Sequence, residues 1–160
     1  MDNFSLNPID VVEEVIYSKK WTFSRADDHE LVAEIASHWS LYRLYFSWSE
    51  EIKAINFTVT FDLKFPESKS KLAYELLAHI NEKLWIGHFD ITSKNGIPAY
   101  RYTVLKPHGN DTLYNQLEDL VDIAIYECEK YYPAFHTILF EDSDPKEALK
   151  LCVIDTLGKA

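Results

Sequence analysis

Side chains that could act as nucleophiles lack the local sequence that such chemistry needs. There is no Gly-x-Ser-x-Gly segment, and neither Cys128 nor Cys152 stands at a glycine-rich turn or a helix start, where a thiolate is stabilised. The four glycines of the chain cannot form a glycine-rich loop that would cradle a phosphate group. We therefore expect neither nucleophilic catalysis nor a phosphate loop.

The histidines and acidic residues show no metal-ligand spacing. No two of the six histidines lie one helical turn apart, and neither cysteine has a near neighbour of its own kind. The acidic segment from Asp27 to Glu30 lacks the alternation and the glycine of a calcium loop, so we interpret it as a solvated turn. We predict no metal and no cofactor.

Glu82 and His88 could act as a general acid–base pair near the end of a predicted helix. No second carboxylate is spaced to complete a catalytic constellation. The alternative is structural: Glu82 beside Lys83, or the ring of His88 donating to the backbone, would hold the helix end against the next strand. We favour this alternative and predict no catalytic residue and no enzymatic activity.

Arg43 and Arg101 each lie in the middle of a predicted strand, among aromatic residues. They could clamp a carboxylate or a phosphate of a ligand. Alternatively they could pair across the sheet with Glu34 or Asp62, with their stems on tyrosine rings. We favour the ion pairs.

Aromatic residues are the most unusual feature of the composition, at 14% of the chain, and they gather in two predicted hairpins. A strand with large side chains on both faces needs a cover for each face, and one cover could be a partner chain, including a second copy in a homodimer. Packing in the chain's own core is the equal alternative. The candidate interaction residues, with the basic ones included, are Tyr45, Trp48, Trp85, His88, Tyr102, Arg43 and Arg101.

The charge of the chain limits its partners. The formal net charge is −10 and only three of the basic residues are arginines, which disfavours nucleic acid and anionic membranes and suits a basic protein or peptide. No apolar run approaches the length of a membrane span, and the N-terminus has no signal-peptide pattern, so we expect a cytoplasmic protein. The length fits a single domain over residues 1–160, with Cys128 and Cys152 packed as small hydrophobes rather than bridged.

The first half of the chain predicts a helix followed by strands. Asn7-Pro8 starts a helix that extends to Lys19, and 21–25 could form a short strand. Strict alternation then predicts strands over 31–39, 42–48 and 55–63, with Phe57 and Phe61 among the buried residues. Such alternation is typical of an antiparallel sheet with one buried face.

The second half is richer in helices. A stripe from Leu72 to Leu84 predicts a helix lying across the apolar face of the sheet. Strands over 85–92 and 99–105 follow, joined by a turn at Lys94-Asn95-Gly96 with positive φ at both central positions. The helix that begins near Leu113 should end or kink at Pro133, while 135–140 could be helical or extended. A last helix starts at Asp144-Pro145 and carries Ala148, Leu149, Cys152 and Val153 on its buried face.

The predicted fold class is α+β. It comprises an antiparallel sheet of about five strands with helices packed on one face, in the order α-β-β-β-α-β-β-α-α.

Two segments, 42–48 and 81–90, resemble the YbjN-like bacterial family, and shorter matches occur at 117–120, 127–129 and 132–135. The resemblance extends from Pro8 to about Gly158. It implies a bacterial, cytoplasmic sensory-transduction regulator with a fold similar to the type III secretion chaperones, and it brings no established catalytic residues. The helix over 144–157 departs from the minimal family pattern.

Three functions remain open from the sequence. The first is a non-enzymatic regulatory or chaperone-like module that binds a protein or peptide. The second is a small-molecule sensor with a pocket between the second helix and the sheet. The third is an enzyme that uses Glu82 and His88.

Overall fold

The computed structural model describes residues 7–108 and 110–158. Its six strands form one antiparallel sheet in the order β1-β2-β3-β4-β6-β5. The predicted α+β class and element order are confirmed, with one strand more than expected because 22–25 pairs with the next strand. The elements are α1 (Pro8–Ser18), β1 (Thr22–Arg25), β2 (Glu30–Ala36), β3 (Leu41–Ser49), β4 (Ala54–Thr60), the 3-10 turn η1 (Glu67–Lys69), α2 (Ser70–Asn81), β5 (His88–Ile91), β6 (Pro98–Leu105), α3 (Asn110–Glu141) and α4 (Pro145–Gly158).

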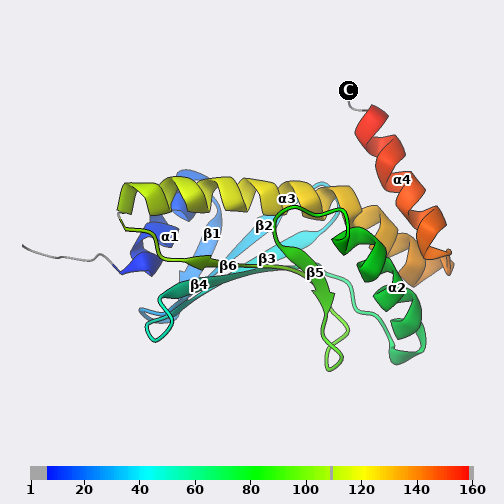
Figure 1. Cartoon of the computed structure of the whole chain (residues 1–160), viewed down its shortest axis with the longest axis horizontal. Coiled ribbons are helices and arrows are strands. Elements are labelled where there is room, and N and C mark those ends of the chain that lie inside the picture. Colours follow the sequence, from blue (N-terminus) through cyan, green and yellow to red (C-terminus); the bar gives the residue numbers. More distant parts are fainter. Residues whose placement is uncertain (1–6, 109, 159–160) are drawn as a thin grey trace, which may run out of the picture.

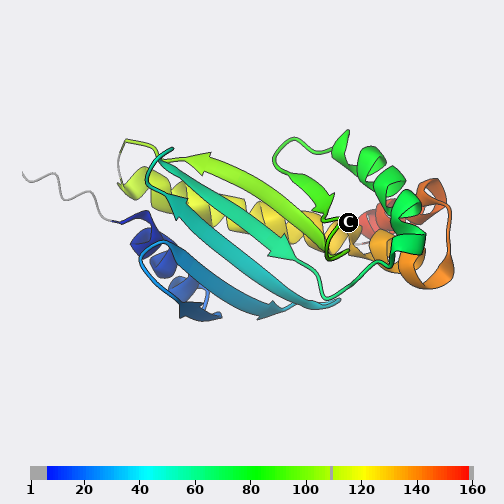
Figure 2. The same cartoon turned by 90° about the horizontal axis from the view of Figure 1, so that it is seen from below.

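The strands alternate between a buried face and an open face, as the sequence predicts. Phe57 and Phe61 are both buried, and the ring of Phe57 stacks on that of Phe46, with 4.6 Å between centroids. The helix α3 runs along this inner face and α1 packs beside it (Figure 1). Seen from the other side, the strands β3, β4 and β6 lie in front of α3 without a covering element (Figure 2). The inner face therefore forms the core, and the outer face is open.

The start of α1 follows the predicted capping. The Asn7 side chain accepts a hydrogen bond from the Ile9 amide at 2.9 Å, and Pro8 occupies the first helical position. Arg25 of β1 reaches the acidic side of this helix, with 2.6 Å from its Nη1 to Asp10 Oδ1 and 3.4 Å to Glu13 Oε2. These ion pairs attach the edge strand to α1.

The predicted position of α2 is wrong. It packs at the end of the sheet against β5, α3 and α4, because α1 and α3 already occupy the inner face (Figure 1). Asn81 fixes its end: the side-chain amide donates to the Phe89 carbonyl at 2.9 Å, and its oxygen accepts from the Phe89 amide at 2.8 Å. The link between the helix end and the next strand that we expected from Glu82 or His88 is thus made by Asn81.

The predicted break at Pro133 is also wrong, because α3 continues through it and residues 135–140 are helical. A proline cannot donate to the carbonyl four residues earlier, which here belongs to Glu129. That carbonyl instead accepts from the indole Nε1 of Trp39 at 3.1 Å, and the Trp39 ring stacks on Tyr132 with 6.2 Å between centroids. A side chain from the β2–β3 turn therefore replaces the lost helical hydrogen bond, and burial of Phe135 holds the remaining turns on the core.

Trp39 can do this because β2 ends earlier than predicted. The strand stops at Ala36, and the next four residues turn, with the Ser37 amide donating to the Ser40 carbonyl at 2.9 Å. The later hairpin also differs in detail, since Gly96 alone among 94–96 has a positive φ, of 68°.

The C-terminal helix begins as predicted, with Asp144 accepting from the Lys146 amide at 3.2 Å. Cys128 and Cys152 are both buried thiols, as expected. Val153 was expected on the buried face but is half exposed. Over the described ranges, no helix combines the length and apolar character that a membrane span requires.

Candidate interaction site on the open sheet face

The register of the sheet brings four of the seven candidate residues to the outer face. Tyr45 of β3 lies opposite Thr58 of β4, Thr58 opposite Arg101 of β6, and Arg101 opposite His88 of β5. One row across four strands is therefore formed by Tyr45, Thr58, Arg101 and His88. Arg43 stands in the adjoining row, between Glu34 and Thr60. Residues far apart in the sequence thus share one surface.

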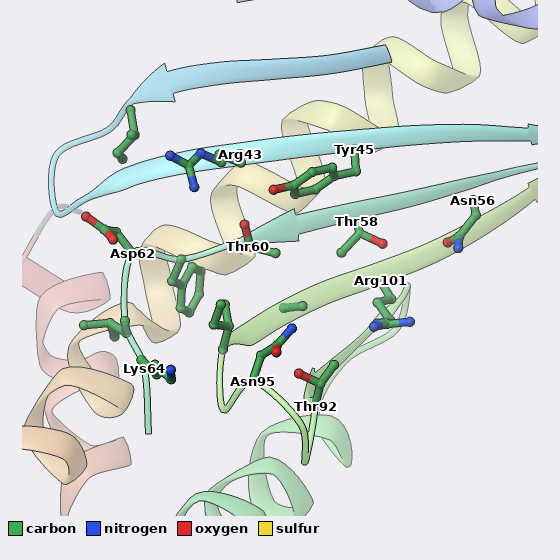
Figure 3. Close-up of a pocket in the computed structure, with 15 residues that line it drawn as sticks. Arg43, Tyr45, Asn56, Thr58, Thr60, Asp62, Lys64, Thr92, Asn95 and Arg101 are labelled. Atoms are coloured by element: carbon green, nitrogen blue, oxygen red, sulfur yellow. The ribbon is translucent and has the colours of Figure 1, made fainter. Parts of the chain in front are cut away.

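This surface contains a hollow. A hollow of about 720 Å³ lies over β3, β4 and β6, with walls from the segment after β4 and from the β5–β6 hairpin (Figure 3). Its floor includes Ala99, a small buried residue at an outward position of β6. The lining residues are Leu41, Arg43, Tyr45, Asn56, Thr58, Thr60, Phe61, Asp62, Leu63, Lys64, Thr92, Asn95, Ile97, Ala99 and Arg101.

The walls are held in place by backbone hydrogen bonds between the two segments. The Phe61 amide donates to the Pro98 carbonyl at 3.2 Å, and the Phe65 amide donates to the Gly96 carbonyl at 2.7 Å. Gly96 permits this approach, because a Cβ atom there would overlap the Phe65 carbonyl oxygen and φ is positive. The shape of the hollow therefore depends on this glycine.

The two arginines stand on strands at opposite sides of the hollow, with Thr58 and Thr60 of β4 between them (Figure 3). Arg43 pairs with Glu34, with 3.1 Å from Nε to Oε1, and this hydrogen bond raises the pKa of the guanidinium. The predicted partner of Arg43 is confirmed. Arg101 lies beside Asp90 instead of the predicted Glu34 or Asp62, because the register places β5 next to β6.

Arg101 is incompletely satisfied. Its Nε is 3.5 Å from Asp90 Oδ2, yet this buried atom forms no hydrogen bond with any described residue. The Thr92 hydroxyl, which lines the same hollow, is likewise buried without a hydrogen bond within the described chain. Buried polar atoms in folded proteins normally have a partner, so both mark a place where a ligand group can bind.

A second hollow, of about 540 Å³, adjoins the first and shares Arg101 and Asn56 with it. Its other lining residues include His88, Gly87 and Tyr102. Tyr102 is half-buried and packs against the core. Arg101 therefore stands at the junction of two depressions on the open face.

The tryptophans lie away from this surface. Trp48 is only 7% exposed, and its indole donates to Glu50 at 2.8 Å, so for this candidate the structure shows the alternative of core packing: its place in the alternation points it inward. Trp85 is fully exposed in the loop before β5, outside both hollows. Tyr45 keeps 39% of its surface exposed at the hollow.

The acid–base candidates do not form a site in the structure. Glu82 and His88 are both exposed, and Glu82 lines none of the hollows described here. Among the described residues, no group of three His, Cys, Asp or Glu side chains is placed to hold a metal ion.

Sequence reasoning missed the hydroxyl and amide side chains of the hollow. The alternation over 55–63 sets Thr58 and Thr60 on the face opposite to the buried Phe57 and Phe61, and this was the available signal. Thr92, Asn95 and Ala99 carried no signal, since their role depends on the fold around them.

Comparison with known proteins finds similarity to a bacterial protein family. The family model described as "YbjN: Putative bacterial sensory transduction regulator" matches residues 8–137. Among solved structures, the crystal structure of YbjN, a "putative transcription regulator" from E. coli, is similar at 11% sequence identity, covers 78% of this chain and 93% of its own, and has a TM-score of 0.49. No curated protein matches by sequence. Because the family match spans well over half of the sequence, the chain belongs to the YbjN family.

Proposed function

We propose that the protein is a non-enzymatic regulator that binds a protein or peptide partner in the hollow on its open sheet face. The observation that carries this proposal is an uncovered sheet face where an exposed tyrosine, two arginines and a row of threonines surround a depression. The description of the family as a regulator supports the general part of the proposal.

The hollow has the chemistry that a peptide requires. The exposed parts of Tyr45 and Leu41 offer apolar surface, and Thr58, Thr60 and Asn95 offer groups that can bond to a peptide backbone. Tyrosine and arginine are enriched among the residues that dominate binding energy at protein interfaces. An extended peptide of a few residues would therefore find both contact area and hydrogen-bond partners here.

A peptide library provides the test. The full chain is immobilised, peptides are selected from a random heptapeptide library, and dissociation constants of the selected peptides are measured by fluorescence polarisation. Tyr45→Ala should weaken binding about tenfold or more, since it removes an aromatic contact at the hollow. Tyr126→Ala is the matched control, because Tyr126 is exposed on α3, in the layer behind the sheet. Equal losses in both variants, or no selected peptide, would refute the proposal.

A small-molecule sensor is the second candidate. The hollow of about 720 Å³ lies within the usual size range of small-molecule sites, and a further one of about 420 Å³ lies between the start of α2 and the β5–β6 hairpin. A panel of metabolites tested by thermal shift separates the two functions. Stabilisation of the wild type by a metabolite that is lost in Thr60→Phe, together with no peptide binding, would favour the sensor.

A further inference from the structure

We infer that the Arg101 side of the hollow binds a carboxylate of the peptide partner, either an acidic side chain or the free C-terminus. The inference rests on the proposed function and adds the chemistry of the bound group. The bound group is thus acidic, whereas the net charge of the whole chain favours a basic partner. Its basis is the local arrangement around Arg101.

Arg101 carries one unused hydrogen-bond donor. Arg101 Nε is buried, and no described residue accepts its hydrogen. Asp90 lies close enough to orient the guanidinium, at 3.5 Å, but does not form that hydrogen bond. The guanidinium is therefore held in position with an unused donor, and a planar fork of N–H groups is the geometry that binds a carboxylate through two parallel hydrogen bonds.

Thr92, elsewhere on the same lining, offers a second unused group. The buried Thr92 hydroxyl also lacks a partner among the described residues, and as a donor it can serve a second ligand oxygen. An apolar ligand would leave both polar atoms buried and unpaired, which is unfavourable. A ligand that carries hydrogen-bond acceptors satisfies them.

The charges around the hollow disfavour a polyanion. Arg43 is paired with Glu34 through a hydrogen bond of 3.1 Å, whereas Arg101 approaches Asp90 only to 3.5 Å and forms no hydrogen bond there, so the Arg101 guanidinium keeps a donor for a ligand. The chain as a whole carries a net charge of −10, which repels extended anions such as nucleic acid. A single carboxylate is compatible with both the local and the global charge.

The experiment uses the same heptapeptide library in two forms, one with free C-terminal carboxylates and one with C-terminal amides. The wild type should enrich Asp, Glu or the free C-terminus, and the dissociation constants should rise with added salt. Arg101→Gln should raise the dissociation constant of the selected acidic peptides about tenfold or more. Arg101→Lys, which keeps the charge without the fork, should restore only part of the affinity, and Thr92→Val should show a smaller loss.

Lys146→Gln on α4 is the control, because it removes one exposed positive charge far from the sheet's open face and should change affinity by less than about twofold. Circular dichroism melting of each variant shows whether it is folded. If Arg101→Gln does not fold, Thr92→Val tests the site in its place. Selected peptides without any preference for carboxylates, or acidic peptides whose binding Arg101→Gln leaves unchanged, would overturn this inference while the proposed function stands. Absence of any selected peptide would instead refute the proposed function.

Discussion

The two faces of the sheet are built from alternate residues of the same strands, yet one face is packed in the core and the other is open to solvent. On β4, Ile55, Phe57 and Val59 point into the core, whereas Thr58 and Thr60 line the open hollow. The inner face is closed by α1 and α3 and is made of aromatic and aliphatic side chains. The outer face mixes polar and apolar side chains, and it carries two buried donors that have no hydrogen-bond partner within the described parts of the chain.

This difference allows single substitutions to separate the stability of the fold from the peptide binding that we propose. A change on an inward position alters packing and hence the free energy of unfolding. A change on the adjacent outward position alters the hollow and leaves the packing intact. Four sets of variants test this difference, and their expected effects decrease in the order given.

The largest effect is expected for Val59→Asp. Val59 is fully buried, so the substitution would bury an unpaired charge at a cost of several kcal/mol, against a typical total stability of about 5–15 kcal/mol. Thr58→Asp, one residue away on the other face, should change stability by less than about 1 kcal/mol but should abolish binding of acidic peptides, because it faces Arg101 across the strands. Urea unfolding measures both, and equal destabilisation would disprove the assignment of faces.

A smaller loss of stability is expected for Gly96→Ala. A positive φ and overlap with the Phe65 carbonyl should cost about 1–3 kcal/mol and displace the hairpin that walls the hollow. The free energy of unfolding and the affinity for a selected peptide should fall together. Asn95→Ala, at the preceding residue, is the control, because it removes a side chain that lines the hollow at a position whose φ is not positive. A stability loss for Asn95→Ala as large as that for Gly96→Ala would contradict this account.

Trp39→Phe tests the continuation of α3 through Pro133. Phenylalanine preserves the stacking on Tyr132 but removes the N–H that serves the Glu129 carbonyl, so a loss of about 1 kcal/mol is expected. Hydrogen exchange of amides in 134–141 should accelerate, while amides of α1 should be unchanged. Unaltered exchange in this part of α3 would show that the indole does not support the helix.

The smallest effect concerns Glu127, whose Oε2 is buried without a hydrogen bond from any described residue. Burial raises the pKa of this carboxyl group above its usual value. The folded state then favours the protonated form. At pH values above the folded pKa the buried carboxylate is charged, so Glu127 lowers the free energy of unfolding most there. Glu127→Gln should raise the melting temperature near pH 8, and the gain should shrink as the pH falls towards about 4. A gain that does not depend on pH would rule out this explanation.

Local sequence signals predicted most of the elements correctly. The Asn7 cap, the Asp144 cap and the alternation of β3 and β4 are determined by neighbouring residues, and they appear as expected. The failures at Pro133 and α2 have a different origin. Pro133 is tolerated because Trp39, distant in sequence, supplies a donor, and α2 is displaced because α3 takes the inner face.

The candidate site was less predictable for the same reason. Arg43 and Arg101 attracted attention by their residue type, and the register of the sheet gives them outward positions. The pairing of β4 with β6, which brings Thr58 beside Arg101, skips β5 in sequence order and has no local signal. The hollow also needs the close contact between Gly96 and Phe65, which only the folded chain shows.

Methyl NMR spectroscopy with a selected peptide tests the separation of the two faces most directly. The methyl groups of Thr58, Thr60 and Ala99 report on the outer face, and those of Val59 and Ile55 report on the inner face of the same sheet. We predict peptide-dependent shifts and intermolecular contacts at the outer methyl groups, with the inner ones unchanged. Contacts confined to other parts of the surface, with the Thr58, Thr60 and Ala99 methyl groups unaffected, would contradict the account.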